Sequence, residues 1–389
     1  MNFTLPTHST THFTPLTAQQ PRLKAIGVGG AGSNAINRMI ELGLSNIEFI
    51  VANTDAQALQ HTLAPTRIQL GPHRTRGLGA GGNPDIGEAA AEESYIPLTQ
   101  ALDGADMVFI AAGMGGGTGT GAAAVVARAA HSVGAITVSV VTTPFSFEVG
   151  RRQANARAGL ARLRAHSDTL ITIPNDRLLS LAGRNLTLEM AFRLADDVLR
   201  QGIQGISELI TEPGLINIDF AHIQQLIKTG GGALLSIGIG EGPNKVEKAI
   251  ERALHHPLLD TLQIEEATAI LVNITASQDI TFIEVMNALS TLQDQAGQCV
   301  EIIPGLMTDE RLQDRAQVIL ILTGLGATPI STNVATPTIA AQPLPGTIAP
   351  SPAIPLQSFA NTPELQPVSA PNDLRSEEHT SELQSPNTI

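Results

Sequence analysis

The chain has 389 residues, of which 42% are hydrophobic, so it is long enough to bury two separate cores. Its formal net charge of −13 argues against binding to nucleic acid, because that binding depends on clustered Lys and Arg. A single cysteine, Cys299, excludes an intramolecular disulfide and a zinc cluster, as is typical of the reducing cytoplasm.

The first 22 residues are rich in Thr and have no basic start followed by an apolar run. We therefore expect residues 1–22 to form a disordered N-terminal arm and not a signal or transit peptide. No apolar run approaches the roughly 18 to 20 residues that a helix needs to cross a bilayer, so we expect no direct membrane insertion.

From residue 23, short apolar runs alternate with longer amphipathic ones. The apolar runs are LKAIGVG, IEFIVAN, ADMVFIAAG, AITVSVV and TLITIP, with helical patterns such as TGAAAVVARAAHSVG between them. This alternation predicts an α/β domain over residues 23–185, with a Rossmann-like parallel sheet covered by helices. Apolar residues at three- and four-residue spacing over 186–210, stopped by Pro213 and Gly214, predict a long central helix in the segment 186–212.

A second set of elements follows in residues 213–326. ALLSIGIG, AILVNITA, CVEIIPGLM and QVILILTGL read as strands, and KVEKAIERAL and FIEVMNALSTL read as helices, so we expect a second, smaller α/β domain. Residues 327–374 are rich in Pro, Thr and Ala and predict a disordered linker. Residues 375–389 begin with RSEEHTSELQS, which resembles the translation of a common sequencing-library adapter, and we expect this segment to be an artefact.

Two glycine-rich segments indicate phosphate binding. The first, GVGGAGSN at 27–34, follows a strand, and glycines at that place let backbone N–H groups approach a phosphate. Asp55 lies near the place where a dehydrogenase has its ribose-binding acid, so an NAD-dependent dehydrogenase is one alternative. The second, GMGGGTGTG, again lies between a strand and a helix, and no GxxxxGK[ST] motif occurs. A dehydrogenase does not need a second segment of this kind. Without the P-loop Lys, the charge of the phosphates must be neutralised by amides, helix dipoles and a metal held mainly by the phosphates, with no metal site made of side chains.

Several motifs resemble the tubulin/FtsZ family of GTPases, and within it the bacterial cell-division FtsZ proteins. They are GVGGAGSNA, NTDAQAL, GLGAGGNPDIG, GGGTGTG, TPFSFE, ITIPNDRLL and PGLINIDFA, in unbroken order from about residue 22 to 326. The resemblance implies a GTPase that binds GTP or GDP with Mg²⁺ and polymerises head to tail in the cytoplasm, at the mid-cell division (Z) ring. Membrane-tethering and regulatory partners of the family bind a C-terminal peptide, and nothing before residue 375 resembles it.

The resemblance also implies nucleotide contacts. They are Gly29, Gly30, Gly32 and Asn34 for phosphate and guanine; Gly79, Ala80, Gly81, Gly82 and Asn83 for the γ-phosphate; Gly115, Gly116, Gly117, Thr118, Gly119 and Thr120 as the main phosphate cradle; Glu148 and Arg152 near the ribose and phosphates; Phe192 on the guanine; and Asp197 as the acceptor for its N1 and amino hydrogens. Asp197 suits guanine because a carboxylate accepts two hydrogen bonds. Three alternatives stay open: Arg152 on a solvated basic face, Phe192 in the core, and one of Asp196 and Asp197 merely exposed.

In this family the active site is completed by a loop of the next subunit, with the pattern N-x-D-F-A-D. Asn217 and Asp219 match this pattern as catalytic residues, but His222 replaces the second Asp. Asp219 is expected to be the N-cap of the next helix, which places His222 at N3, where the helix dipole favours a neutral ring. Such a ring can accept a proton from water, but it supplies no negative charge.

Four interpretations of the loop stay open. His222 tunes hydrolysis; or the chain binds GTP and polymerises but hydrolyses little, as a structural filament protein; or His222 is a read error; or Asp219 serves only as a cap.

Overall fold

The computed structural model describes residues 20–148, 150–179, 187–212, 214–216, 218–228, 231–259 and 264–325. Contacts divide the chain into two units, residues 1–331 and 332–389, and all of the described residues lie in the first. The predicted N-terminal arm up to residue 19, the linker at 327–374 and the segment 375–389 lie outside the described residues.

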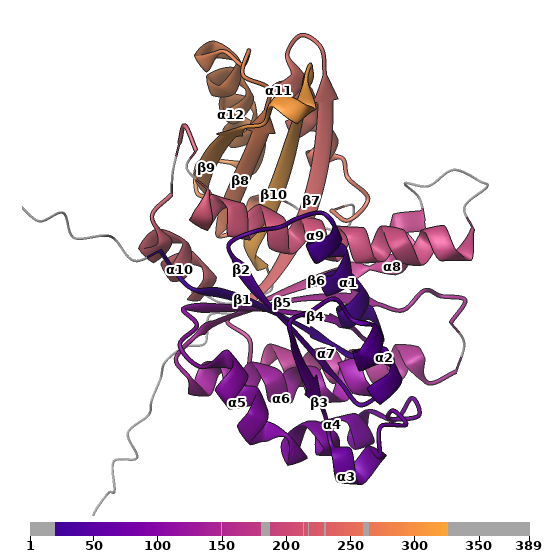
Figure 1. Cartoon of the computed structure of the whole chain (residues 1–389). Helices are drawn as coiled ribbons and strands as arrows, with labels where there is room; N and C mark the ends of the chain where they lie inside the picture. Colours follow the sequence, from indigo (N-terminus) through magenta and orange to yellow (C-terminus); the bar gives the residue numbers. More distant parts are fainter. Residues whose placement is uncertain are drawn as a thin grey trace, which may run out of the picture. The chain divides into compact units, whose positions relative to one another are not determined.

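One ten-stranded sheet runs through the described unit in the order β3-β2-β1-β4-β5-β6-β7-β10-β8-β9 (Figure 1). Neighbouring strands from β3 to β7 are parallel, β10 is antiparallel to both β7 and β8, and β8 and β9 are parallel. The strands are β1 (Leu23–Val28), β2 (Ile47–Asn53), β3 (Thr66–Gln69), β4 (Met107–Gly113), β5 (Ile136–Thr143), β6 (Thr169–Pro174), β7 (Gly231–Glu241), β8 (Ala269–Ala276), β9 (Glu301–Thr308) and β10 (Arg315–Leu325).

Helices cover the sheet between these strands. They are α1 (Gly29–Glu41), α2 (Ala56–His61), α3 (Pro72–Thr75), α4 (Pro84–Glu93), α5 (Tyr95–Leu102), α6 (Thr118–Ser132), α7 (Arg152–Arg164), α8 (Asn175–Leu178), α9 (Leu188–Thr211), α10 (Phe220–Lys228), α11 (Lys245–Leu254) and α12 (Phe282–Ala296), with short 3₁₀ helices at Ile264–Glu266 and Glu310–Leu312. The predicted α/β fold with a Rossmann-like sheet, a long central helix and a second α/β part is therefore confirmed.

Alternating side chains of the strands build separate cores on the two faces of the sheet. In the N-terminal half, one face packs against α4, α5, α6 and α7, and the other packs against α1, α9 and α10. In the C-terminal half, α11 and α12 cover the outer faces of β8 and β10. A Cβ at Gly240 would lie 1.7 Å from the carbonyl oxygen of Lys245, so glycine there lets α11 lie directly on β7.

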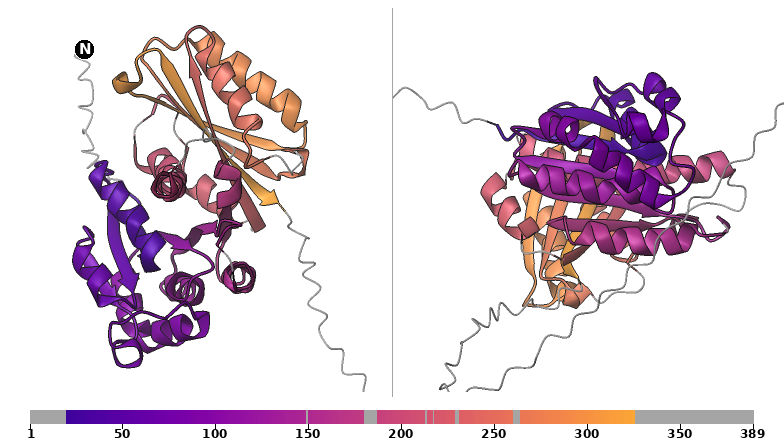
Figure 2. Two further views of the ribbon diagram at one scale, coloured as in Figure 1. Left: turned by 90° about the vertical axis from the view of Figure 1, so that its right-hand side faces the viewer. Right: turned by 90° about the horizontal axis from the view of Figure 1, so that it is seen from below.

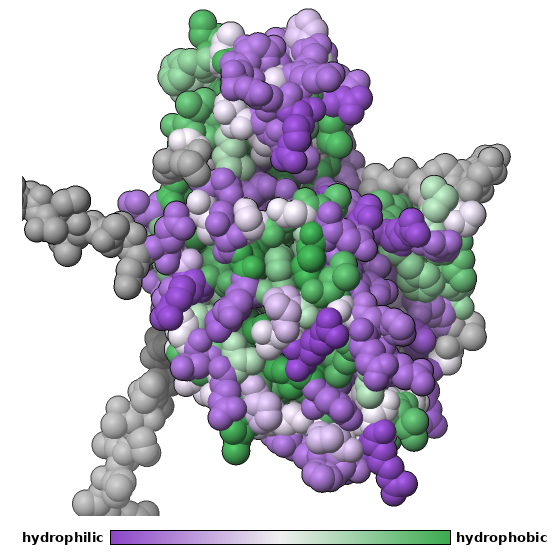
Figure 3. Space-filling model, in the orientation of Figure 1, coloured by the Kyte–Doolittle hydropathy of each residue, from purple (hydrophilic) through white to green (hydrophobic). Residues whose placement is uncertain are grey.

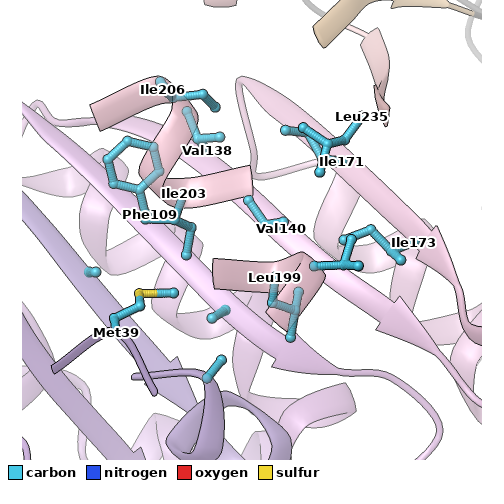
Figure 4. Packing of buried hydrophobic residues seen from close by; sticks show 14 of the residues in the cluster. Met39, Phe109, Val138, Val140, Ile171, Ile173, Leu199, Ile203, Ile206 and Leu235 are labelled. Atoms are coloured by element: carbon cyan, nitrogen blue, oxygen red, sulfur yellow. The ribbon is translucent and has the colours of Figure 1, made fainter. Parts of the chain in front are cut away.

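Helix α9 joins the two halves. Its apolar face packs against β5 through Val138 and Val140 and against β7 through Leu235, in the cluster drawn in Figure 4. Figure 2 shows α9 between the N-terminal half and the C-terminal half. Because one buried cluster includes residues of both halves, the two halves share a core as well as a sheet.

Hydrophilic and hydrophobic residues are mixed on the surface, and hydrophobic ones gather near the middle of the face shown in Figure 3. Within the described residues, the helices fall short of the length and apolarity that would let one cross a membrane.

Candidate nucleotide site

The predicted phosphate-binding segments meet at the carboxyl ends of β1 and β4. These strands are parallel neighbours, with Val28 opposite Ala112, and each is followed by a helix, α1 after β1 and α6 after the turn at 115–117. The N-terminal ends of both helices border a cavity of about 290 Å³, which we call the glycine cavity. It is lined by Val28, Gly30, Ala31, Gly113, Met114, Gly116, Gly117, Thr118, Gly119, Thr142, Pro144, Glu148, Arg152, Asn175, Phe192, Ala195 and Asp196.

The first glycine segment divides into two roles. Gly30 lines the glycine cavity, and an added Cβ there would meet nothing within 4 Å. In contrast, a Cβ at Gly32 would lie 2.3 Å from the carbonyl oxygen of Ala111, and one at Gly29, where φ is +71°, would lie 2.9 Å from the amide nitrogen of Gly119. Gly29 and Gly32 therefore let α1 approach β4 and α6, whereas Gly30 leaves room for a ligand.

The residues of the segment 115–120 also fall into two groups, those beside the cavity and those that hold the turn in shape. Gly116 has open space at its Cα, and Thr118 lines the glycine cavity, with its hydroxyl 2.6 Å from the hydroxyl of Thr54. Thr120 is 1% exposed, and its hydroxyl accepts a hydrogen bond of 2.8 Å from the amide of Gly115, whose φ is +100°. Thr120 therefore holds the turn in shape, while the hydroxyl of Thr118 is the one beside the cavity.

The segment at 79–83 lies beside this turn. A Cβ added at Gly117 would lie 2.9 Å from the Cβ of Ala80 and 3.0 Å from the amide nitrogen of Asn83. The side chain of Asn83 caps α4 by accepting from the amide of Asp85. The three glycines of the segment have left-handed φ values and open space at their Cα atoms; they are Gly79, Gly81 and Gly82. They line no part of the glycine cavity, but Gly81, Gly82 and Asn83 line an adjoining one with Arg151 and Asn155.

Glu148 and Arg152 both line the glycine cavity and form an ion pair of 2.5 Å. The other oxygen of Glu148 accepts from the amide of Phe145, so this carboxylate is fixed while Arg152 is half exposed. The structure therefore places Arg152 at the glycine cavity, and its side chain is not confined to a solvated face; its contact with the sugar and phosphates stays a prediction.

A second cavity of about 580 Å³ adjoins the first and shares Phe192 and Asp196 with it. We call it the Asn34 cavity; it is lined by Asn34, Asn37, Arg38, Glu41, Glu189, Phe192, Arg193 and Asp196. Phe192 is 41% exposed and makes an edge contact with Phe145, with ring centroids 5.5 Å apart. It is therefore a wall of both cavities and not a core residue.

The structure places Asp196, and not the predicted Asp197, beside both cavities. Asp197 accepts from Nε of Arg200 at 2.8 Å and from the amide of Gln201. Burial acts to raise the pKa of Asp197, but the Arg200 guanidinium and the Gln201 amide outweigh it and hold that pKa below its ordinary value. Burial raises the pKa of Asp196 to about 7, against the opposing charge of Arg38. Both carboxylate oxygens of Asp197 thus accept hydrogen bonds within its own helix, and Asp196 is the acceptor that faces the cavities.

Asn175 also lines the glycine cavity and was missing from the predicted site. It is 5% exposed, and its Oδ1 atom has no hydrogen-bond partner in the part of the chain that the structure describes. A buried acceptor without a partner costs about 1–3 kcal/mol, so a ligand with a hydroxyl or amino donor would stabilise it. This orphaned acceptor and the open glycines fit a nucleotide with its sugar and phosphates.

The predicted interface loop lies apart from these cavities. Helix α10 begins at Phe220, and the carbonyl of Asp219 accepts from the amides of His222 and Ile223, so Asp219 stands at the N-cap and His222 at N3 as predicted. His222 Nε2 lies 3.2 Å from Glu301 Oε1. Asn217 lies outside the described residues. Neither Asp219 nor His222 lines the two described cavities of its own chain.

Side chains offer no obvious metal site. Among the described residues, no three His, Cys, Asp or Glu side chains are grouped so that they could hold a metal ion. A metal bound with a nucleotide would therefore depend mainly on phosphate oxygens for its ligands.

A parallel sheet with two helix N-termini, open glycines and an acidic acceptor at its carboxyl edge defines a nucleotide-binding α/β protein. Residues 22–183 match the family model of the tubulin/FtsZ GTPase domain, and residues 231–326 match that of the FtsZ C-terminal domain. An empty FtsZ dimer from M. jannaschii is 41% identical, covering 80% of this chain and 90% of that one, with a TM-score of 0.75. The chain therefore belongs to the tubulin/FtsZ family of GTPases.

More distant structures share the fold alone. CetZ2 from Haloferax volcanii, solved as a GTPγS-bound protofilament, is 22% identical over 77% of this chain and 92% of that one, with a TM-score of 0.65. CetZ1 from the same organism, a GDP-bound monomer, is 19% identical over 79% of this chain and 96% of that one, with a TM-score of 0.67.

Proposed function

We propose that this chain binds GTP in the two joined cavities, polymerises head to tail and hydrolyses GTP where two subunits meet, as a filament protein of the bacterial division ring in the cytoplasm at mid-cell. The observation that carries the proposal is the pair of helix N-termini with open glycines at Gly30 and Gly116, next to an acceptor for guanine. It is supported by membership of a GTPase family and by a fold shared with a protofilament-forming protein.

Different residues would bind the phosphates and the sugar of the nucleotide. Backbone amides at Gly30, Gly116 and Thr118 would hold the phosphates, aided by the dipoles of α1 and α6. Arg152 would approach the phosphates, while Glu148 and Asn175 would face the sugar. A bound Mg²⁺ would supply further positive charge on the phosphates.

The guanine base would be recognised beside Phe192. Phe192 would pack against the ring, and Asp196 would accept from the N1 and amino hydrogens of guanine. Adenine has no donor at these positions, so the carboxylate would select guanine.

Hydrolysis would need the loop of a second subunit, because Asp219 and His222 lie away from the cavities of their own chain. In-line attack by water on the γ-phosphate requires an acceptor that orients the water. Asp219 would provide a carboxylate and His222 a ring nitrogen. Division proteins that tether the filament to the membrane would bind a C-terminal peptide outside the described residues.

His222 favours a second candidate, a GTP-binding structural filament that hydrolyses little. The test is phosphate release and sedimentation with GTP, for the wild type and for His222→Asp over a range of protein concentrations. Release by the wild type that rises steeply with protein concentration supports the GTPase. GTP-dependent pelleting with little release, increased at least about tenfold by His222→Asp, supports the structural filament. Absence of both GTP binding and pelleting would refute the proposed function.

A further inference from the structure

His222 has a neighbour that changes its chemistry. It is the third residue of α10, and its Nε2 atom lies 3.2 Å from Oε1 of Glu301, the first residue of β9. The two elements are held together below this contact, because Leu226 of α10 and Ile303 of β9 share a buried cluster. The loop before α10 is also fixed to β9, since the amide of Leu306 donates to the carbonyl of Ile216. Both α10 and β9 lie on the left-hand side of Figure 1.

The contact between His222 and Glu301 contributes little to the stability of the fold. The side chains of His222 and Glu301 are 45% and 56% exposed, and an ion pair between exposed side chains adds little to stability. The main consequence of the contact is for the ring itself. A carboxylate only accepts hydrogen bonds, so the hydrogen must be on Nε2, and this leaves the lone pair of the neutral ring on Nδ1.

We propose that Glu301 is a positioning residue for GTP hydrolysis: it fixes His222 in the Nε2–H tautomer and restores the negative charge that the loop lacks with histidine at this place. The inference rests on the proposed function, in which the loop faces the nucleotide of a second copy of this chain. A neutral His222 with an ionised Glu301 carries a charge of −1, the same as the aspartate of the family pattern that His222 replaces. The pair can therefore both accept a proton and attract a polarised water.

A water O–H bond breaks and its proton moves to Nδ1 of His222, while the water oxygen forms a bond to the γ-phosphorus. The bond between that phosphorus and the β,γ-bridging oxygen breaks, and GDP leaves with the electron pair. The proton on the imidazolium then passes to solvent. Glu301 stabilises the imidazolium meanwhile, as a carboxylate does when it orients a catalytic histidine.

Other charged residues belong to α10, to the loop before it and to a cavity at its first residue. Asp219 precedes the helix, Lys228 stands in its last turn, and Arg22 and Asp106 border a cavity beside Phe220. Among these groups, only Asp219 belongs to the proposed catalytic loop.

The experiment compares kcat for phosphate release at saturating GTP in wild type, Glu301→Gln, His222→Asp and the double variant. Gln keeps an acceptor for Nε2–H but has no charge. We expect Glu301→Gln to lower kcat about tenfold to a hundredfold, with KM for GTP unchanged, because the base itself remains and the loss should not exceed the roughly hundredfold lower limit for general-base catalysis. In the His222→Asp background the same change should leave kcat unaltered, because no imidazole remains to be oriented.

Two controls separate this role from a structural one. Pelleting with a non-hydrolysable GTP analogue should be equal in all variants, and Glu251→Gln, which removes an exposed carboxylate from α11, should leave kcat unchanged. An equal loss from Glu301→Gln in both backgrounds would overturn the inference, as would no loss in either.

Failure of the inference is distinguishable from failure of the proposed function. A wild type that binds GTP, pellets and hydrolyses it, but is insensitive to Glu301→Gln, refutes only the role of Glu301. A wild type that pellets with GTP but releases no phosphate also refutes that role and leaves the filament intact. A wild type that neither binds GTP nor pellets refutes both.

Discussion

Replacing Asp196 by Asn tests how guanine is recognised. Burial raises the pKa of Asp196 from 3.8 to about 7, so the folded protein holds its proton more tightly than the unfolded chain does. Ionisation therefore costs the nucleotide-free protein stability as the pH rises from about 4 to 7. A rise from 3.8 to about 7 corresponds to roughly 4 kcal/mol at most. Asn cannot ionise, so Asp196→Asn should raise the unfolding free energy of the nucleotide-free protein at pH 8 by up to this amount.

Asp196→Asn should stabilise the nucleotide-free protein but weaken its binding of GTP. Guanine donors need the ionised carboxylate, which with a pKa of about 7 makes up about nine-tenths of the protein at pH 8 and about one-tenth at pH 6. The apparent Kd for GTP should therefore weaken about tenfold between pH 8 and pH 6. Asn loses charge-assisted hydrogen bonds of about 1.5–3 kcal/mol each, so at pH 8 it should weaken GTP binding about a hundredfold.

Calorimetry with GTP and with xanthosine triphosphate, at pH 6 and pH 8, measures both effects. Xanthine carries an oxygen in place of the 2-amino group of guanine, so the amide of Asp196→Asn should bind it better than the wild type does. Parallel titration of the variant corrects for protonation of the phosphates themselves. Asp197→Asn is the control, because its carboxylate is bonded to Arg200. If Asp197→Asn weakens GTP binding a hundredfold and Asp196→Asn does not, the assignment from the structure is wrong.

Further predictions concern the glycine and threonine positions. Gly30→Ala should weaken GTP binding about tenfold without changing the melting temperature, because its methyl group would enter the glycine cavity. Gly32→Ala should instead lower the unfolding free energy by about 1–3 kcal/mol, because its Cβ would lie 2.3 Å from the carbonyl oxygen of Ala111; equal melting temperatures for the two variants would contradict this distinction. Thr120→Val should lower the unfolding free energy by about 1–3 kcal/mol, because the amide of Gly115 loses its buried acceptor, and an unchanged urea midpoint would exclude that role.

Much of the fold follows from sequence periodicity. The predicted helix at 186–210 is α9 at Leu188–Thr211, because its apolar spacing and the Pro-Gly stop are local signals. Helices α4 and α5 went unpredicted, although Asn83 as N-cap and Pro84 at N1 are a recognisable start signal. The pairing of β6 with β7, which makes one sheet of both halves, joins residues about 60 positions apart, and no local pattern encodes it.

The site was predictable to the level of segments but not of side chains. Asp196 lies four residues after Phe192, hence on the same helix face, and that spacing could have identified it in place of Asp197. The separate roles of Gly30 and Gly32 depend on the distance from α1 to β4, which the sequence does not give. The partnerless acceptor of Asn175 likewise depends on what surrounds it in the folded chain.

The length of α9 explains why hydrolysis should require two subunits. Asp196 lies in its N-terminal half and borders the cavities, while Thr211 ends it, and at 1.5 Å per residue these positions are about 22 Å apart along the axis. The following loop is fixed beyond that end, where Ile216 pairs with Leu306 of β9, and Figure 1 shows α10 and α8 at opposite ends of α9. A chain therefore holds its proposed water-orienting groups far from its own nucleotide cavity. In the proposed filament, contact between one end of α9 and the opposite end in the next chain would be a heterologous interface, which would repeat along the filament and couple assembly to hydrolysis.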